Sequence, residues 1–156
     1  MSTDDSRTIA AERAARQHGP GETSDSPQRP AQQVTGATLT FDLAAELSRL
    51  QAEASWQRGD RNAITLVKEP TFRVVLTAMK PGARLQNHQA DAPLTLHVVA
   101  GRLHLRVSDQ TIDLAAGHLV ALQPGVEHDV EATDESAFLL TVGGLNPAAD
   151  ATARPS

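Results

Sequence analysis

Two histidines, His88 and His128, are the residues whose type and setting best suit chemistry in this sequence. A neutral imidazole binds divalent transition metals, and it also forms hydrogen bonds in ligand pockets. The sequence contains no cysteine, so thiolate metal ligands, disulfides and a cysteine nucleophile are excluded. No G-x-S-x-G, phosphate-binding glycine loop, dinucleotide fingerprint or H-E-x-x-H occurs either. These absences leave histidine side chains, with His88 and His128 among them, as candidates for a site.

Short strands must position these histidines. From residue 61 onward the sequence consists of short runs rich in Val, Leu, Ile and Thr, separated by turn sequences such as KPG, AGR and QPG. In RLHLRV, residues 102–107, apolar and polar side chains alternate, as a half-buried strand requires. This pattern of short apolar runs separated by turns predicts an all-β, antiparallel domain over residues 61–144.

One amphipathic helix is expected before the strands. Residues 41–56, FDLAAELSRLQAEASW, place three leucines at helical spacing, with charged residues away from that stripe. Asp42 or Thr40 would cap its N-terminus. We expect the helix to pack on the outside of the domain or across a dimer contact.

The remaining segments have the composition of tails. Residues 1–36 and 146–156 are polar, rich in Ser, Gly, Pro and Ala, and lack large apolar residues, so we expect both to be disordered. The 156-residue chain has a net charge of -5 and no Lys/Arg cluster, which argues against nucleic acid as a partner. No apolar run suits a signal peptide or a membrane span, so a cytoplasmic protein is expected.

The segment around His88 resembles the first motif of the cupin family, G-x5-H-x-H-x3-E-x6-G. Gly82, His88 and Gly101 match at full spacing, whereas Ala90 and Leu94 stand where the family has a histidine and a glutamate. Two of the three ligand positions of this motif are therefore substituted.

The segment around His128 resembles the second cupin motif, G-x5-P-x-G-x2-H-x3-N. Gly117, Gly125 and His128 match, with Gln123 at the usual proline and Ala132 at the usual asparagine. The resemblance implies a single-domain jelly-roll β-barrel of the RmlC-like type, similar to small bacterial cupins.

A cupin metal site resembles a cage of three imidazoles and one carboxylate, of which only His88 and His128 remain here. Leu94 supplies neither a ligand nor a charge, so we expect no tightly bound cofactor, and two imidazoles alone would hold a divalent metal weakly. His97 and Asp91 are candidates for a further ligand. Alternation from Leu94 places His97 on the outer face, and Asp91 lies in a loop.

The alternative to a metal site is a ligand pocket in which the imidazoles form the polar end. Its expected residues are His88, His128, Gln86, Leu94 and Leu96, with Gln86 placed by alternation on the strand face of His88. A third interpretation is that the two histidines line the barrel interior and form hydrogen bonds to a neighbour or water, without binding a ligand.

Three functions remain open. The first is a metal-poor module that binds a small organic molecule or acts as a sensor. The second is a divergent metal-dependent enzyme, an oxygenase or isomerase, that uses His88 and His128 as ligands. The third is a structural, dimerising, stress-related protein. In each case the outward-facing Val99 and the helix stripe make a homodimer the expected assembly. The acidic run EHDVEATDE, residues 127–135, is read as a solvated strand edge.

Overall fold

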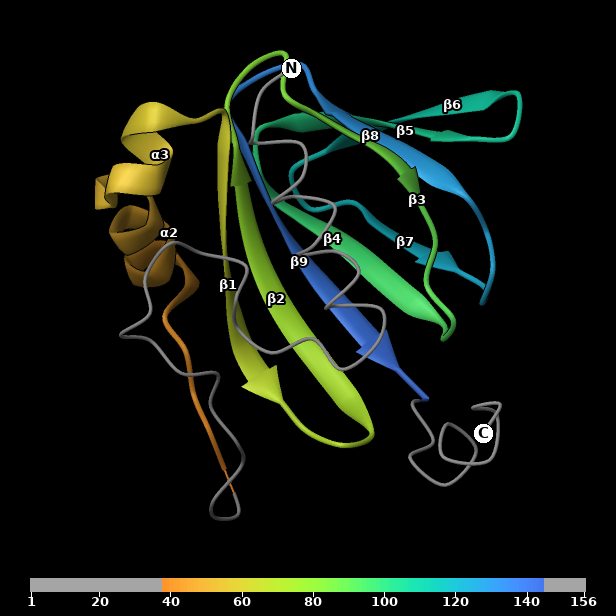
Figure 1. Cartoon of the computed structure of the whole chain (residues 1–156), viewed down its shortest axis with the longest axis horizontal. Coiled ribbons are helices and arrows are strands. Elements are labelled where there is room, and N and C mark those ends of the chain that lie inside the picture. Colours follow the sequence, from red (N-terminus) through yellow and green to blue (C-terminus); the bar gives the residue numbers. More distant parts are fainter. Residues whose placement is uncertain (1–37, 145–156) are drawn as a thin grey trace, which may run out of the picture.

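The computed structural model describes residues 38–144, which form two antiparallel sheets that face each other, with helices beside one of them (Figure 1). The strand order is β1-β2-β9-β4-β7 in the five-stranded sheet and β3-β8-β5-β6 in the four-stranded sheet. The strands are β1 (Arg61–Lys68), β2 (Phe72–Met79), β3 (Arg84–His88), β4 (Leu94–Ala100), β5 (Arg102–Val107), β6 (Gln110–Ala115), β7 (Leu119–Leu122), β8 (His128–Ala132) and β9 (Ser136–Gly143). The expected antiparallel, mostly β architecture is confirmed.

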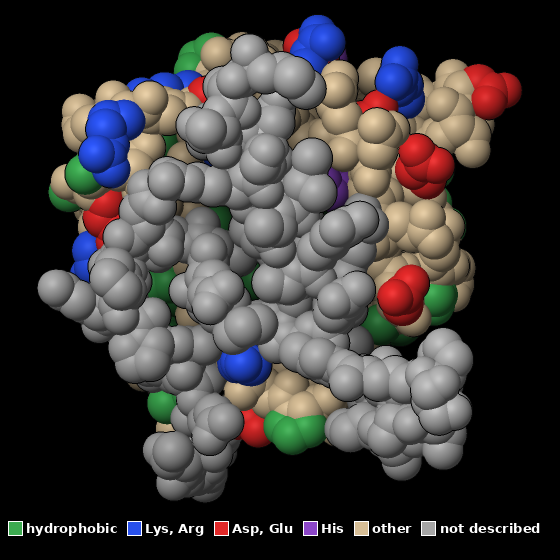
Figure 2. Space-filling view, viewed as in Figure 1, with side chains coloured by type: hydrophobic (Ala, Val, Ile, Leu, Met, Phe, Trp, Pro, Cys, Tyr) green, Lys and Arg blue, Asp and Glu red, His purple; other side chains and the backbone are tan. Residues whose placement is uncertain are grey.

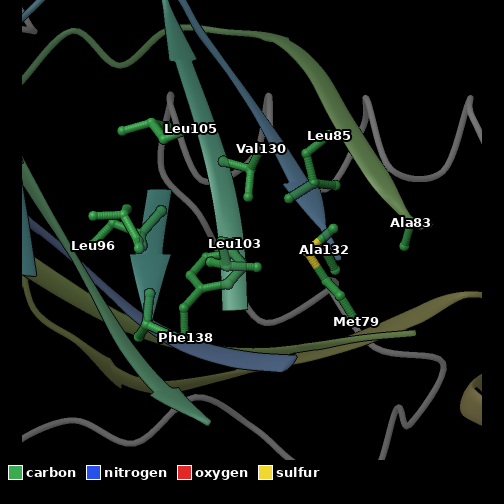
Figure 3. Packing of buried hydrophobic residues seen from close by; sticks show 11 residues of the cluster. Met79, Ala83, Leu85, Leu96, Leu103, Leu105, Val130, Ala132 and Phe138 are labelled. Atoms are coloured by element: carbon green, nitrogen blue, oxygen red, sulfur yellow. The ribbon is translucent and has the colours of Figure 1, made fainter. Parts of the chain in front are cut away.

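An apolar cluster between the sheets holds them together (Figure 3). Met79 and Phe138 come from the five-stranded sheet, and Leu103, Leu105 and Ala132 come from the four-stranded sheet; each is at most 3% exposed. Because successive side chains of a strand point to opposite faces, alternate residues such as Leu103 and Leu105 enter the cluster. This alternation determines which residues face the space between the sheets.

Two helices pack against the outer face of the five-stranded sheet, next to β1 and β2. They are α2 (Leu43–Ala52) and α3 (Ala54–Arg58), where one helix was expected over residues 41–56. Asp42 caps α2, because its Oδ1 accepts a hydrogen bond from a backbone N–H of the first turn at 3.1 Å. Glu53 separates the helices with an extended backbone, ψ 154°.

Asn62 of β1 explains where α2 ends. Its buried amide donates to the backbone carbonyl of Leu50 at 2.9 Å and to the carboxylate of Glu53 at 2.8 Å. A carbonyl of the last helical turn is thereby satisfied by a side chain of the sheet, and the helix is held against β1.

Gly101 joins β4 to β5 at a point of close approach between two loops. Its φ is +75°, and a Cβ atom there would collide with the backbone carbonyl of Glu135 and the hydroxyl of Ser136. That hydroxyl accepts a hydrogen bond from the N–H of Arg102 at 2.9 Å. Only glycine fits both the positive φ and the contact.

The expected tails, residues 1–36 and 146–156, lie outside the described residues. Among residues 38–144, no helix has both the length and the apolar character needed to cross a membrane.

Candidate functional site

A β-bulge places His88 on the inner face of the four-stranded sheet. In the β3–β8 ladder Leu85 pairs with Val130 and His88 pairs with His128, so two residues of β3 stand opposite one residue of β8. If residues 85–88 formed a regular ladder without a bulge, alternation from the buried Leu85 would turn His88 outward. With the bulge, His88 is buried, at 8% exposure.

Asn87 and Asp129 hold the bulge. Asn87 adopts the left-handed conformation, φ 58°, and its backbone N–H donates to Oδ1 of Asp129 at 2.7 Å. The guanidinium of Arg106 donates to Oδ2 of the same carboxylate at 2.6 Å. The Asn87 hydrogen bond, followed by Arg106, keeps the pKa of Asp129 below its usual value. A carboxylate on the outer face therefore fixes the backbone that turns His88 inward.

His128 lies beside His88 in an orientation fixed by the backbone. Its side chain is 7% exposed, and Nδ1 lies 3.0 Å from the carbonyl oxygen of Val126. Because a carbonyl oxygen only accepts, Nδ1 must carry the proton of this hydrogen bond. The two imidazole centroids are 6.0 Å apart and the rings are tilted by 53°.

An apolar row of the five-stranded sheet faces the two imidazoles; it consists of Leu122, Leu94 and Val142, which are paired across β7, β4 and β9. The link is Val107, which pairs with His128 in the other sheet and packs against the cluster that contains the row. The imidazoles and the apolar row therefore lie at the same end of the two sheets.

The structure brings four of the five expected site residues to the space between the sheets. His88, His128 and Leu94 lie at this end, and Leu96, 1% exposed, belongs to the adjoining core cluster. Gln86 is exposed, because the bulge breaks the alternation that placed it on the face of His88. The structure therefore separates Gln86 from the other four.

The other candidate ligands lie away from the histidine pair. His97 alternates with the buried Leu96 and Val98 and is only partly buried, on the outer face of β4, and Asp91 is exposed in the β3–β4 loop. Within residues 38–144 no group of three or more His, Asp or Glu side chains could hold a metal ion. The described donors therefore do not fit the four-ligand metal cage that the sequence resemblance implies.

The outer face of the four-stranded sheet carries cross-strand ion pairs, Arg84 with Glu131 and Arg102 with Asp113 among them. Figure 2 shows both basic and acidic side chains on the described surface of one side of the molecule. Exposed pairs of this kind contribute little stability each. Asp129, read from the sequence as part of a solvated edge, differs because it also binds the bulge backbone.

A protein-family model and a set of solved structures match this chain. A family model described as the cupin domain matches residues 75–143, from β2 to β9, a range that includes both histidines. A search of curated proteins found no match.

Solved structures share this fold at low identity. A protein of unknown function from Streptococcus pyogenes is 16% identical, with a TM-score of 0.59, over 78% of this chain and 99% of its own. A cupin-2 domain containing protein from Shewanella frigidimarina is 19% identical, with a TM-score of 0.55, over 67% of this chain and 94% of its own.

A mutant of salicylate 1,2-dioxygenase from Pseudoaminobacter salicylatoxidans is 13% identical, with a TM-score of 0.60, over 76% of this chain. The match spans 40% of that enzyme. At these identities the likeness shows the fold alone.

Proposed function

This chain is a cupin-domain protein, and on that premise we propose that it binds a small organic molecule between its two sheets, beside His88 and His128. The observation that carries the proposal is the pair of buried imidazoles, at 8% and 7% exposure, that faces the apolar row. Ligand sites are mostly apolar and contain a few placed polar groups, and this end of the molecule has that composition.

The orientation of His128 supports this role. With Nδ1 donating to Val126, the Nε2 atom of the neutral ring is an acceptor, so the ring can receive a hydrogen bond from a ligand hydroxyl or amide. His88 adds a second imidazole within 6.0 Å, centroid to centroid. A ligand would thus meet two polar contacts at one end and aliphatic side chains along its body.

A metal-dependent oxygenase or isomerase is the main alternative, and it needs ligands that these strands do not bring to the histidines. Ala90 and Leu94 occupy the two substituted positions, and His97 lies on the other face of β4. We therefore favour binding without a metal, in a cytoplasmic module whose sensory output, if it has one, passes through a separate partner.

A structural dimer is the remaining alternative. Among the described residues Leu119 is the exposed large hydrophobic side chain, at 60%, and it lies on the edge strand β7. An exposed apolar edge suits pairing with a second copy, and a homodimer is compatible with ligand binding. Dimerisation with no ligand response is the result that favours a purely structural role.

The test is a thermal-shift screen of the purified protein against small organic acids, their amides, alcohols and sugars. A His88→Gln and His128→Gln double variant is screened in parallel, with His104→Gln as the control, since His104 lies on the outer face beside Asp113. The metal content of the wild type and of both variants is measured by elemental analysis after dialysis.

A compound that stabilises the wild type and the control but not the double variant supports the proposal, since a bound ligand stabilises the folded state. No stabilising compound, or an equal response from the double variant, rejects it. Stoichiometric metal that survives dialysis in the wild type and is lost in the double variant would establish the metal-dependent alternative instead.

A further inference from the structure

Arg73 is a buried charge at the inner face that the sequence did not single out. It is 6% exposed, and it begins the alternating run Arg73, Val75, Thr77 and Met79 on β2, of which Met79 lies in the cluster between the sheets. The intervening residues of β2 pack against the helix side. The guanidinium is therefore attached to the face that looks toward the four-stranded sheet.

The strand register places Arg73 at the end of the molecule that holds the histidines. Arg73 pairs with Val142 of β9, and Val142 pairs with Leu94 of β4. Arg73 therefore extends the apolar row by one strand, on the side away from Leu122. The row faces His88 and His128, so one cation and two imidazoles share one end of the space between the sheets.

Thr65 adds a hydroxyl next to this position. It pairs with Val75, the residue that follows Arg73 on the same face of β2. Its Oγ1 atom is buried and has no hydrogen-bond partner within the part of the chain that the structure describes. A buried hydroxyl without a partner is unfavourable, and a bound acceptor would satisfy it.

We propose that the molecule bound here is an organic anion whose carboxylate is held by Arg73, with Thr65 as a second donor. The planar guanidinium has five N–H donors, so it can bind a carboxylate through two parallel hydrogen bonds while it keeps other contacts. The apolar row contacts the aliphatic or aromatic body, and the imidazoles contact polar substituents. This inference rests on the proposed function and names its ligand class.

Burial strengthens the attraction between the Arg73 guanidinium and a ligand carboxylate. A charge-assisted hydrogen bond is about twice as strong as a neutral one, and a low-dielectric position screens the charges less than water does. A ligand that carries a carboxylate should therefore bind more tightly than a neutral compound of the same shape. The matched pair of acid and primary amide isolates this difference.

The experiment measures binding of benzoate and benzamide, and of hexanoate and hexanamide, to the full chain by calorimetry and ligand-observed NMR. The variants are Arg73→Gln, which removes the charge, Arg73→Lys, which keeps it without the planar fork, and Thr65→Val. Arg102→Gln is the matched control, because Arg102 is an exposed arginine of the outer face. Circular dichroism confirms that each variant is folded.

We expect each acid to bind the wild type and the Arg102 control at least about tenfold more tightly than its amide. Arg73→Gln should abolish this preference by weakening acid binding far more than amide binding, and Arg73→Lys should keep part of it. Thr65→Val should weaken acid binding by a smaller factor.

Amides that bind as tightly as acids would overturn the anion inference and leave the proposed function standing. An acid preference that survives Arg73→Gln would overturn the role of Arg73. Loss of stability in both Arg73 variants, with no acid preference in the wild type, would assign Arg73 to an internal structural contact. Failure of all four probes, together with a silent broad screen, would reject both proposals.

Discussion

Replacing Asp129 with alanine should release the bulge that turns His88 inward. The carboxylate accepts the N–H of Asn87 at 2.7 Å and pairs with Arg106 at 2.6 Å. Alanine removes both contacts at once and leaves the strained left-handed conformation of Asn87 without its anchor.

The expected loss follows from the two contacts. A hydrogen bond to a charged group contributes about 1.5–3 kcal/mol. The Arg106 pair is worth only about 0.2–1 kcal/mol, because its guanidinium side chain is 63% exposed. Asp129→Ala should therefore lower the free energy of unfolding by about 2–4 kcal/mol, and Arg106→Gln by at most about 1 kcal/mol.

Urea unfolding measures these free energies, and imidazole ¹H–¹⁵N spectra report the environment of His88 in each folded variant. The Asp129 variant should move the His88 signals, whereas Arg106→Gln should leave them close to their wild-type positions. Equal losses in the two variants, with unmoved His88 signals, would refute the view that Asp129 acts through the bulge backbone.

The effect should also depend on pH. The pKa of Asp129 in the folded protein lies below its ordinary value of 3.8, chiefly because the N–H of Asn87 donates to it. A depressed carboxyl pKa adds stability that is present above the unfolded pKa and is lost as pH falls through the folded pKa. The stability difference between the wild type and Asp129→Asn should thus be constant at neutral pH and shrink below about pH 3.8. A difference that grows on acidification would contradict the assignment.

Three further predictions concern single positions and are measured by urea or thermal unfolding. Gly101→Ala should destabilise the protein by more than about 2 kcal/mol, because its Cβ collides with the backbone of a neighbouring loop at positive φ; a neutral result would contradict the close approach. Asn62→Ala should cost about 2–4 kcal/mol through its two lost hydrogen bonds, and an unchanged midpoint would show that α2 does not depend on this contact. Asn87→Gly should be neutral or stabilising and Asn87→Val destabilising, by about 1–2 kcal/mol; the reverse order would exclude the left-handed conformation.

Local patterns made much of the fold predictable. Alternation identifies the strands, and the Asp42 cap follows from residue type and position. The end of α2 at Ala52 could not be predicted, because the side chain that satisfies Leu50 is Asn62, which comes from a different element. Helical periodicity in the sequence continues through Glu53, although the backbone of Glu53 is extended and its carboxylate accepts a hydrogen bond from Asn62.

The positions of site residues could be predicted where a sequence motif fixes their spacing. They could not be predicted where the pairing of strands determines which face a side chain occupies. His88 and His128 were recognised as a pair, since the motif spacing already contains the bulge. Gln86 was misplaced, because strict alternation cannot represent the bulge. Arg73 was missed because the run FRVVLTAM does not reveal which of its two faces meets the opposite sheet until the register with β9 is known.

The bulge in β3 also changes how this site can be altered by changes in chain length. Removing Asn87 would leave Gln86 opposite Asp129 and His88 opposite His128 in a regular ladder, with the histidine still facing inward. Inserting one residue instead would displace His88 from its partner. This strand therefore tolerates shortening by one residue where it does not tolerate lengthening: a deletion at the bulge keeps the imidazole beside His128, whereas an insertion moves it away.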